Sequence, residues 1–305
     1  MAEALSRVQR SAGGAAGTVG EACLSSVEQE ETSRGYAVRA VDRWRNGASS
    51  HEDDCIAEEV PVAMVYNGAT FAVMMASPHD LDDFALGFSL TERLIGDPSQ
   101  LLQLETHALI EGIELSMRVT DNAPGAHLDQ ERQRLLPGRS GCGICGTREL
   151  ENAVRHDGAV GEGVAISRDA LEAALRELKE RQPMNLATGA VHAAAWADTA
   201  GRILLVREDV GRHNALDKLI GAIHRAGIDV NTGFALVTSR ASYEMVTKAA
   251  SAGIALLAAI SAPTALAIEL ARSAGITLVG FARPGSHNVY THPGRLLAAE
   301  SREHS

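Results

Sequence analysis

The stretch Ala252-Gly253-Ile254-Ala255-Leu256-Leu257-Ala258-Ala259-Ile260 decides the fold of this chain. Glycine readily adopts the left-handed backbone that ends many helices, and an apolar residue commonly follows it. The six residues that begin at Ala255 are all apolar, which is typical of a strand buried on both faces of a sheet. The stretch therefore predicts the end of a helix followed by a central strand.

The same Ala-Gly-Ile triplet occurs at 226–228 and 274–276, each time after an amphipathic or alanine-rich segment. Apolar strands are also expected at 235–237 and 277–281. Fully apolar strands that alternate with helices indicate a sheet with parallel segments, covered by helices on both faces. We therefore expect an α/β/α sandwich over residues 150–305.

The first half of the chain predicts a smaller α+β domain at 36–138. Two apolar runs, 58–66 and 70–75, are joined by Asn67-Gly68. Because both of these residues tolerate positive φ, the dipeptide favours a tight hairpin. Periodicity predicts two further features, a helix from Leu81 and one or two strands between His107 and Thr120.

Composition and charge restrict the class of protein. The 305 residues are 45% hydrophobic, enough for a full core, and the net charge of -11 argues against nonspecific nucleic-acid binding. Four cysteines without paired spacing do not suggest a secreted disulfide framework. The glycine- and serine-rich residues 1–35 are expected to be a disordered tail without a secretory signal. We expect a cytoplasmic protein with reduced thiols, no membrane segment and no nucleic-acid partner.

A glycine-rich segment, Ser140-Gly141-Cys142-Gly143-Ile144-Cys145-Gly146, carries two of the four cysteines. The other two, Cys23 and Cys55, are isolated near the N-terminus. The glycines predict a mobile loop at 139–149, and Arg139 and Arg148 beside it favour the reactive thiolate. Three interpretations remain open from spacing alone. The pair could be half of a zinc site, although the chain has no second cysteine pair to complete it. It could also be a dithiol redox motif, or a sulfur relay that carries a persulfide.

Polar residues follow the predicted strands at the edge where open α/β sheets bind ligands. The turns after the strands at 203–206, 235–237 and 277–281 each carry one arginine, namely Arg212, Arg240 and Arg283. Together with helix N-termini, three arginines at one edge are suited to an anionic ligand. We therefore expect one anion site at this edge of the sheet.

His192 lies in a segment that resembles the H-x-E motif of zinc-dependent deaminases. In those enzymes the histidine binds zinc and the glutamate transfers protons. Here the glutamate position is Ala194, and no P-C-x-x-C follows. Hydrolytic deamination and a bound metal are therefore not expected.

Five motifs in order resemble one family, the formate dehydrogenase accessory sulfurtransferases known as the FdhD/NarQ family. They are Gly141–Gly146, Thr188–Ala195, Glu208–Lys218, Ser239–Met245 and Asn288–His292. The resemblance covers roughly Val38 to Leu296, nearly everything but the tails. It is specific because all five motifs occur in the same order.

The resemblance implies a sulfurtransferase with a cytidine-deaminase-like fold in its second half. Such a protein takes sulfur from a cysteine desulfurase as a persulfide. It passes the sulfur to the molybdenum (or tungsten) bis(molybdopterin guanine dinucleotide) cofactor, which is then inserted into formate dehydrogenase. The resemblance also implies a cytoplasmic protein that forms a homodimer.

The resemblance also assigns residues. Cys142 corresponds to the persulfide-bearing cysteine and Cys145 to its partner, and the loop Phe281–Ser286 matches the segment that binds the guanine nucleotide. GDP is the expected analogue of half of the cofactor. The chain departs from the family at the end of this loop, where Ser286-His287 replaces an expected basic residue. The candidate cofactor-binding residues are Asp209, Arg212, His213, Ser239, Arg240, Phe281, Ala282, Arg283, Pro284, Gly285 and Ser286.

Two functions of other classes remain open. A dithiol oxidoreductase would use Cys142 and Cys145 without a nucleotide. A non-catalytic chaperone would bind the cofactor and deliver it to formate dehydrogenase without carrying sulfur.

Overall fold

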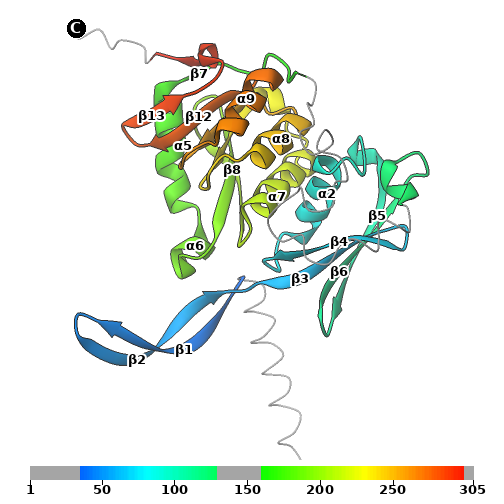
Figure 1. The fold of residues 1–305 in the computed structure, drawn as a ribbon, viewed down its shortest axis with the longest axis vertical. Helices are drawn as coiled ribbons and strands as arrows, with labels where there is room; N and C mark the ends of the chain where they lie inside the picture. Colours follow the sequence, from blue (N-terminus) through cyan, green and yellow to red (C-terminus); the bar gives the residue numbers. More distant parts are fainter. Residues whose placement is uncertain (1–34, 129–158, 299–305) are drawn as a thin grey trace, which may run out of the picture.

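The computed structural model describes residues 35–128 and 159–298. The predicted tail and the glycine-rich loop with Cys142 and Cys145 lie outside the described residues. The described residues form a mixed α/β protein with two main sheets and a projecting two-stranded ribbon (Figure 1).

The larger sheet has six strands in the order β13-β12-β11-β10-β8-β9. Strands β10, β11 and β12 pair in parallel, whereas β8, β9 and β13 are joined by antiparallel pairs. The bounds are β8 His192–Asp198, β9 Ile203–Asp209, β10 Gly233–Val237, β11 Leu256–Ala259, β12 Thr277–Arg283 and β13 Ser286–Val289. The three apolar strands predicted from the sequence are β10, β11 and β12.

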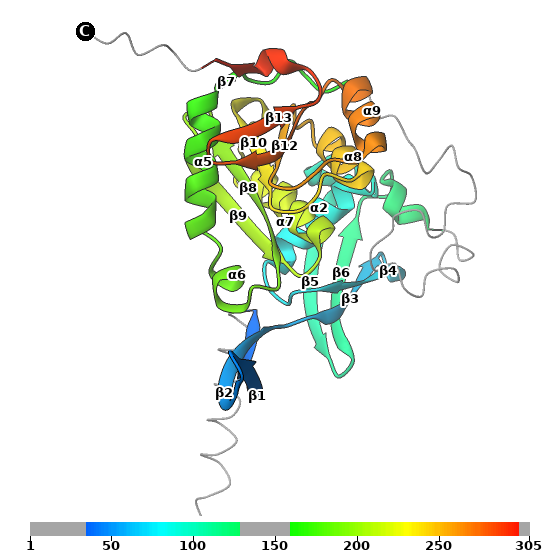
Figure 2. The ribbon, with the colours of Figure 1, turned by 60° about the vertical axis from the view of Figure 1, so that its left-hand side comes forward.

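Helices cover both faces of this sheet, which confirms the expected three layers (Figure 2). One face packs against α7 (Arg212–Arg225), α8 (Tyr243–Ser251) and α9 (Ala265–Ala274). The other face packs against α5 (Arg168–Glu180), whose first turn is capped by the Ser167 hydroxyl. Alternate residues of β8 divide between the two cores, so the sheet is buried on both sides.

The Ala-Gly-Ile triplets end helices as predicted. Gly227, Gly253 and Gly275 have φ values of 63°, 73° and 77°, the left-handed region that glycine adopts without strain. The isoleucine after each glycine is at least half-buried. The repeated triplet therefore marks helix C-termini that lead into the sheet.

The N-terminal half contains a four-stranded sheet in the order β4-β3-β6-β5, packed against α2 (Leu81–Thr91). Asn67 and Gly68 both have positive φ, which confirms the tight hairpin between β3 and β4. The region at His107–Thr120 belongs to a second hairpin, so two strands are present. The bounds are β3 Val60–Tyr66, β4 Ala69–Ala76, β5 Leu101–Leu109 and β6 Gly112–Val119.

The remaining elements are short or project from the body. The ribbon of β1 (Tyr36–Arg45) and β2 (Ala48–Ala57) extends away from both sheets (Figure 1). Other short elements are α6 Pro183–Thr188, β7 Ile166–Ser167 and β14 Leu296–Leu297, with 3-10 turns at Pro98–Gln100, Pro124–His127, Val230–Thr232 and Pro293–Arg295. Within the described ranges, no helix has the length and apolarity needed to cross a membrane.

The two halves meet where α2 crosses α7 at a pair of glycines. A Cβ atom at Gly87 would lie 1.8 Å from the Asp217 carbonyl oxygen, and one at Gly221 would lie 1.9 Å from the Asp83 carbonyl oxygen. No side chain larger than hydrogen fits either position without moving a helix. This crossing holds the N-terminal sheet against the side of the sandwich that carries α7.

Candidate functional site

Strands β9, β10, β11 and β12 all run toward the same edge of the six-stranded sheet, because β8 is antiparallel to both β9 and β10. Helices α7 and α8 begin at this edge with Gly211 and Ser242 as N-caps, and neither makes a side-chain cap. In contrast, the Thr264 hydroxyl caps α9. Two neighbouring helices therefore offer uncapped N–H groups, which favour an anion.

Arg212, His213 and Arg240, whose charges act on His192 at the start of β8, are called the cationic cluster of this edge. Burial lowers the pKa of the His192 imidazole, and the nearby charges of Arg212, His213 and Arg240 lower it further, against an opposing effect from Asp209. Four of the predicted site residues are thus close enough to affect one histidine. Arg212 and Arg240 of the predicted anion site therefore lie near His192 in the described residues, and the anion site itself stays a prediction.

Several polar atoms at this edge are buried without a hydrogen-bond partner in the described residues. They include Arg212 Nε and Ser242 Oγ. His213 Nε2 lies 2.7 Å from Glu244 Oε2, as an ion pair when the imidazole is protonated. Buried polar atoms normally find partners, so a ligand with oxygen acceptors would complete this site.

Ser239 and Arg240 follow β10 at the same edge. Ser239 is buried, and its hydroxyl donates to the Arg240 carbonyl oxygen at 3.1 Å. The Arg240 side chain is exposed. Ser239 therefore shapes the turn, whereas Arg240 is free to reach a ligand.

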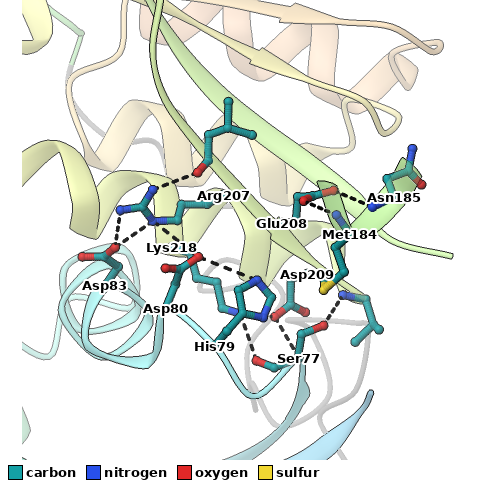
Figure 3. A network of polar contacts seen from close by, with 12 residues as sticks. Ser77, His79, Asp80, Asp83, Met184, Asn185, Arg207, Glu208, Asp209 and Lys218 are labelled. Carbon is teal, nitrogen blue, oxygen red and sulfur yellow. Dashed lines mark hydrogen bonds and ion pairs between the residues drawn. The ribbon is translucent and has the colours of Figure 1, made fainter. Parts of the chain in front are cut away.

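The structure places Asp209 differently from the sequence expectation, which put it in the turn after a strand at 203–206. Strand β9 continues to Asp209, and the carboxylate is fully buried (Figure 3). Oδ1 accepts from the Gly211 N–H at 2.7 Å and the Asn214 amide at 3.0 Å. Oδ2 accepts from the Ser77 N–H at 3.0 Å and contacts Lys218 Nζ at 2.7 Å. With four donors around it, Asp209 holds the turn that carries Arg212 and His213.

Ser77 of the N-terminal half and Lys218 of α7 support this turn. Lys218 Nζ donates to the Ser77 carbonyl oxygen at 3.0 Å, and the Ser77 hydroxyl accepts from the Val210 N–H at 3.1 Å (Figure 3). Neither Ser77 nor Lys218 was predicted to support the site, although Lys218 ends the family motif Glu208–Lys218. They are 132 and 9 positions away from Asp209, and the only local signal was a lysine in the apolar interior of a predicted helix.

Neighbouring groups of the same network are also buried. Glu208 accepts from the N–H groups of Met184 and Asn185 at 2.9 and 2.8 Å and so caps the start of α6 (Figure 3). Burial raises the pKa of the Glu208 carboxyl. His79 lies close by, and burial together with the charges of Lys218 and Arg207 lowers the pKa of its imidazole to about 4. These groups fix the architecture beneath the edge site.

The loop Phe281–Ser286 forms the hairpin between β12 and β13. Arg283 pairs with Ser286, so Pro284 and Gly285 make a two-residue turn with Gly285 at φ 82°. Ala282 is buried, and the other five residues of the loop are exposed. Glu172 of α5 holds the turn, because both of its carboxylate oxygens lie 2.9 Å from the Gly285 nitrogen.

The loop and the cationic cluster occupy different parts of the same edge. Strand β12 is separated from β8 by β11 and β10, which corresponds to about 14 Å at ordinary strand spacing. Arg283 has no contact with the cluster in the described structure. The three arginines therefore line one edge without meeting at one point.

The predicted catalytic residues, Cys142 and Cys145, lie outside the described residues. In the part of the chain that the structure covers, no three His, Cys, Asp or Glu side chains gather as a metal site requires. The described site is thus defined by arginines, histidines and helix N-termini. A mixed α/β protein with a cluster of cationic side chains at the end of its central sheet is the class that this geometry defines.

Comparison with known proteins gives the family. The sequence model of the FdhD/NarQ family matches residues 57–297. A sulfur carrier protein FdhD from Xanthomonas euvesicatoria pv. vesicatoria is 54% identical over 273 residues, which cover 90% of this chain and 96% of that protein. One from Cupriavidus necator is 48% identical over 280 residues, with the same coverage. The chain therefore belongs to the FdhD/NarQ family.

The fold has a counterpart among solved structures. The crystal structure of a candidate formate dehydrogenase accessory protein from Desulfotalea psychrophila superimposes with a TM-score of 0.67. The match covers 86% of this chain and 99% of that one, at 24% sequence identity. At this level of identity, the similarity concerns the fold.

Proposed function

We propose that this chain carries sulfur, as a persulfide on Cys142, from a cysteine desulfurase to the molybdenum bis(molybdopterin guanine dinucleotide) cofactor of a formate dehydrogenase. The name of the curated relatives, sulfur carrier protein FdhD, supports the first part of this proposal. The motif Gly141–Gly146 supports the assignment of Cys142 and Cys145, which were identified by their match to the family.

The first chemical step needs only thiol exchange. The Cys142 thiolate attacks the outer sulfur of the donor persulfide, a new S–S bond forms, and the donor cysteine leaves as a thiolate. No electrons are gained or lost overall. Arg139 and Arg148 flank the cysteine pair in sequence and favour the thiolate form of Cys142.

The cationic cluster is the observation that carries the acceptor side of the proposal. The cofactor is the substrate that receives sulfur, and its guanine dinucleotide arms bring several phosphates. Uncapped N-termini of α7 and α8, the buried Arg212 Nε and the exposed Arg240 suit those phosphates. Asp209 contributes by holding the turn, rather than by facing the ligand.

Other features follow from the family resemblance. We propose that residues 150–305 form a cytidine-deaminase-like domain, joined to the α+β domain 36–138 by the loop 139–149. The residue at the position of the deaminase glutamate is Ala194 of β8, whose methyl side chain offers no proton-transfer group. A cytoplasmic homodimer is the proposed working form.

GDP binding tests the acceptor site. Calorimetry should detect GDP binding to the wild-type chain, and Arg240→Ala should weaken it about tenfold to a hundredfold, as expected when one charge-assisted contact is lost. Arg272→Ala is the matched control, because Arg272 is exposed on α9 and pairs with Glu269. Unchanged GDP affinity in the Arg240 variant would place the nucleotide elsewhere. Persulfide formation on Cys142 should be normal in both variants.

A further inference from the structure

The Glu172 carboxylate places a negative charge beside the loop Phe281–Ser286, whereas the cationic cluster is positively charged. In a Pro-Gly turn the N–H of the glycine is a free donor that could serve a phosphate. Here this N–H is taken by Glu172, with both carboxylate oxygens 2.9 Å from the Gly285 nitrogen. A phosphate beside the turn would meet a negative charge instead of a donor.

The carboxylate still has capacity to accept hydrogen bonds. An ionised carboxylate has about four acceptor positions, and Gly285 supplies a single N–H. The other contact of Glu172 is Arg176 Nη1, at 3.8 Å from Oε2, and the Arg176 side chain is 63% exposed. The Glu172 side chain is 19% exposed, so it can be reached from outside. The group is suited to a ligand that brings two neighbouring N–H donors.

Phe281 adds an aromatic surface to the same loop. It is 41% exposed, and its φ of 51° is unusual for a residue other than glycine. Non-glycine residues held in this region often belong to ligand sites. An exposed ring can stack on any planar base, at little cost in conformational entropy.

The distance along the sheet edge indicates how a nucleotide would lie across it. Strands β8 and β12, which lead to the cationic cluster and to the loop, are three strand spacings apart, or about 14 Å between their axes. An extended nucleoside diphosphate spans a comparable length between its base and its phosphates. One nucleotide can therefore place phosphates at the start of α7 and α8 and its base at the loop.

We propose that Glu172 is the specificity-determining residue of the nucleotide site, and that it selects guanine by accepting the N1–H and the exocyclic amino group. This inference rests on the proposed nucleotide function and adds the orientation and the base preference. Adenine presents an acceptor at N1 and no amino group at C2, so its amino group at C6 could offer the carboxylate one donor but not the neighbouring pair that guanine offers. A pocket that hydrogen-bonds one ligand strongly rejects an analogue lacking the donors.

Calorimetry with GDP, IDP and ADP tests the proposal on the full-length chain. Wild type should bind GDP best, IDP less well because the amino group is missing, and ADP least. Glu172→Gln should lower GDP affinity about tenfold to a hundredfold while ADP affinity stays unchanged. Glu180→Gln, exposed on the same helix, is the control and should behave as wild type.

The outcomes separate the two claims. Arg240→Ala should weaken GDP and ADP by the same factor, because it acts at the phosphate end. If Glu172→Gln keeps the wild-type ratio of GDP to ADP affinity, or lowers both alike, Glu172 merely positions the loop and the proposal is wrong. If wild type binds none of the three nucleotides, the nucleotide function itself fails, and the base preference fails with it.

Discussion

At the scale of single residues, Asp209 shows how a predicted ligand-binding group can serve as a support. Its carboxylate joins the Gly211 turn, the Lys218 ammonium and the Ser77 backbone, and it is fully buried (Figure 3). Breaking one partner of a buried ion pair leaves an uncompensated charge, which is strongly unfavourable. Arg212 and His213 therefore depend on contacts that lie beneath the site.

Sequence reasoning found the arginines but not this support. A position after a predicted strand is a local signal, and it identified Arg212 and Arg240 correctly as residues of the sheet edge. The partner Ser77 lies 132 positions from Asp209, and one unaligned sequence gives no sign that the two meet. The extent of β9 was also misjudged, because polar Glu208 and Asp209 break an apolar strand pattern while their side chains are satisfied by tertiary contacts.

His79 predicts a loss of stability in acid. Its pKa is lowered to about 4 in the folded protein, mainly by burial. The unfolded chain, with a pKa near its ordinary value of about 6.5, therefore binds protons first as the pH falls. The stability is complete above pH 6.5 and is lost toward pH 4. His79 faces the charges of Lys218, Asp209, Arg207 and Asp80.

The measurement is urea unfolding at several pH values. Between pH 7.5 and pH 5 the free energy of unfolding should fall by about 2 kcal/mol less in His79→Asn than in wild type, whatever the effect of the substitution at neutral pH. His107→Asn is the control, because His107 is exposed beside Glu105 on β5. An equal pH dependence in wild type and in the His79 variant would contradict the burial of a neutral imidazole.

At the scale of elements, the sequence was most informative where structure is local. Asn67-Gly68 identified its hairpin because positive φ is a property of those two residues. The Ala-Gly-Ile triplets identified three helix ends for the same reason. The crossing of α2 over α7 was not predicted, because a glycine inside a helix signals close packing without naming the partner.

Gly221→Ala tests the crossing. The added methyl would lie 1.9 Å from the Asp83 carbonyl oxygen, so the helices would have to separate. Alanine is favoured over glycine in a helix by about 1 kcal/mol, yet overpacking should dominate and destabilise the protein by about 1–3 kcal/mol net. Gly96→Ala is the control, since its Cβ would meet only the flexible Gln100 side chain at 3.6 Å. Chemical denaturation that finds Gly221→Ala as stable as wild type would disprove a tight crossing.

At the scale of the whole molecule, the chain separates two tasks. The six-stranded sheet presents the proposed anion site at one edge, where strands end and the uncapped helices α7 and α8 begin. The cysteine pair belongs to a glycine-rich segment between the two halves of the sequence. The α/β class and the layers were predictable from apolar strands and helix ends. The cysteine segment lies outside the described residues, so its predicted relation to the edge site stays a prediction.

The central claim is that Cys142 carries sulfur, and intact-mass measurement tests it most directly. The chain is incubated with a cysteine desulfurase and cysteine, then weighed without reductant. We expect a gain of about 32 Da per sulfur atom, reversed by a thiol reductant and absent in Cys142→Ala. Cys55→Ala should gain the same mass as wild type. A chain that gains no mass, or a Cys142→Ala variant that gains as much as wild type, would contradict the account.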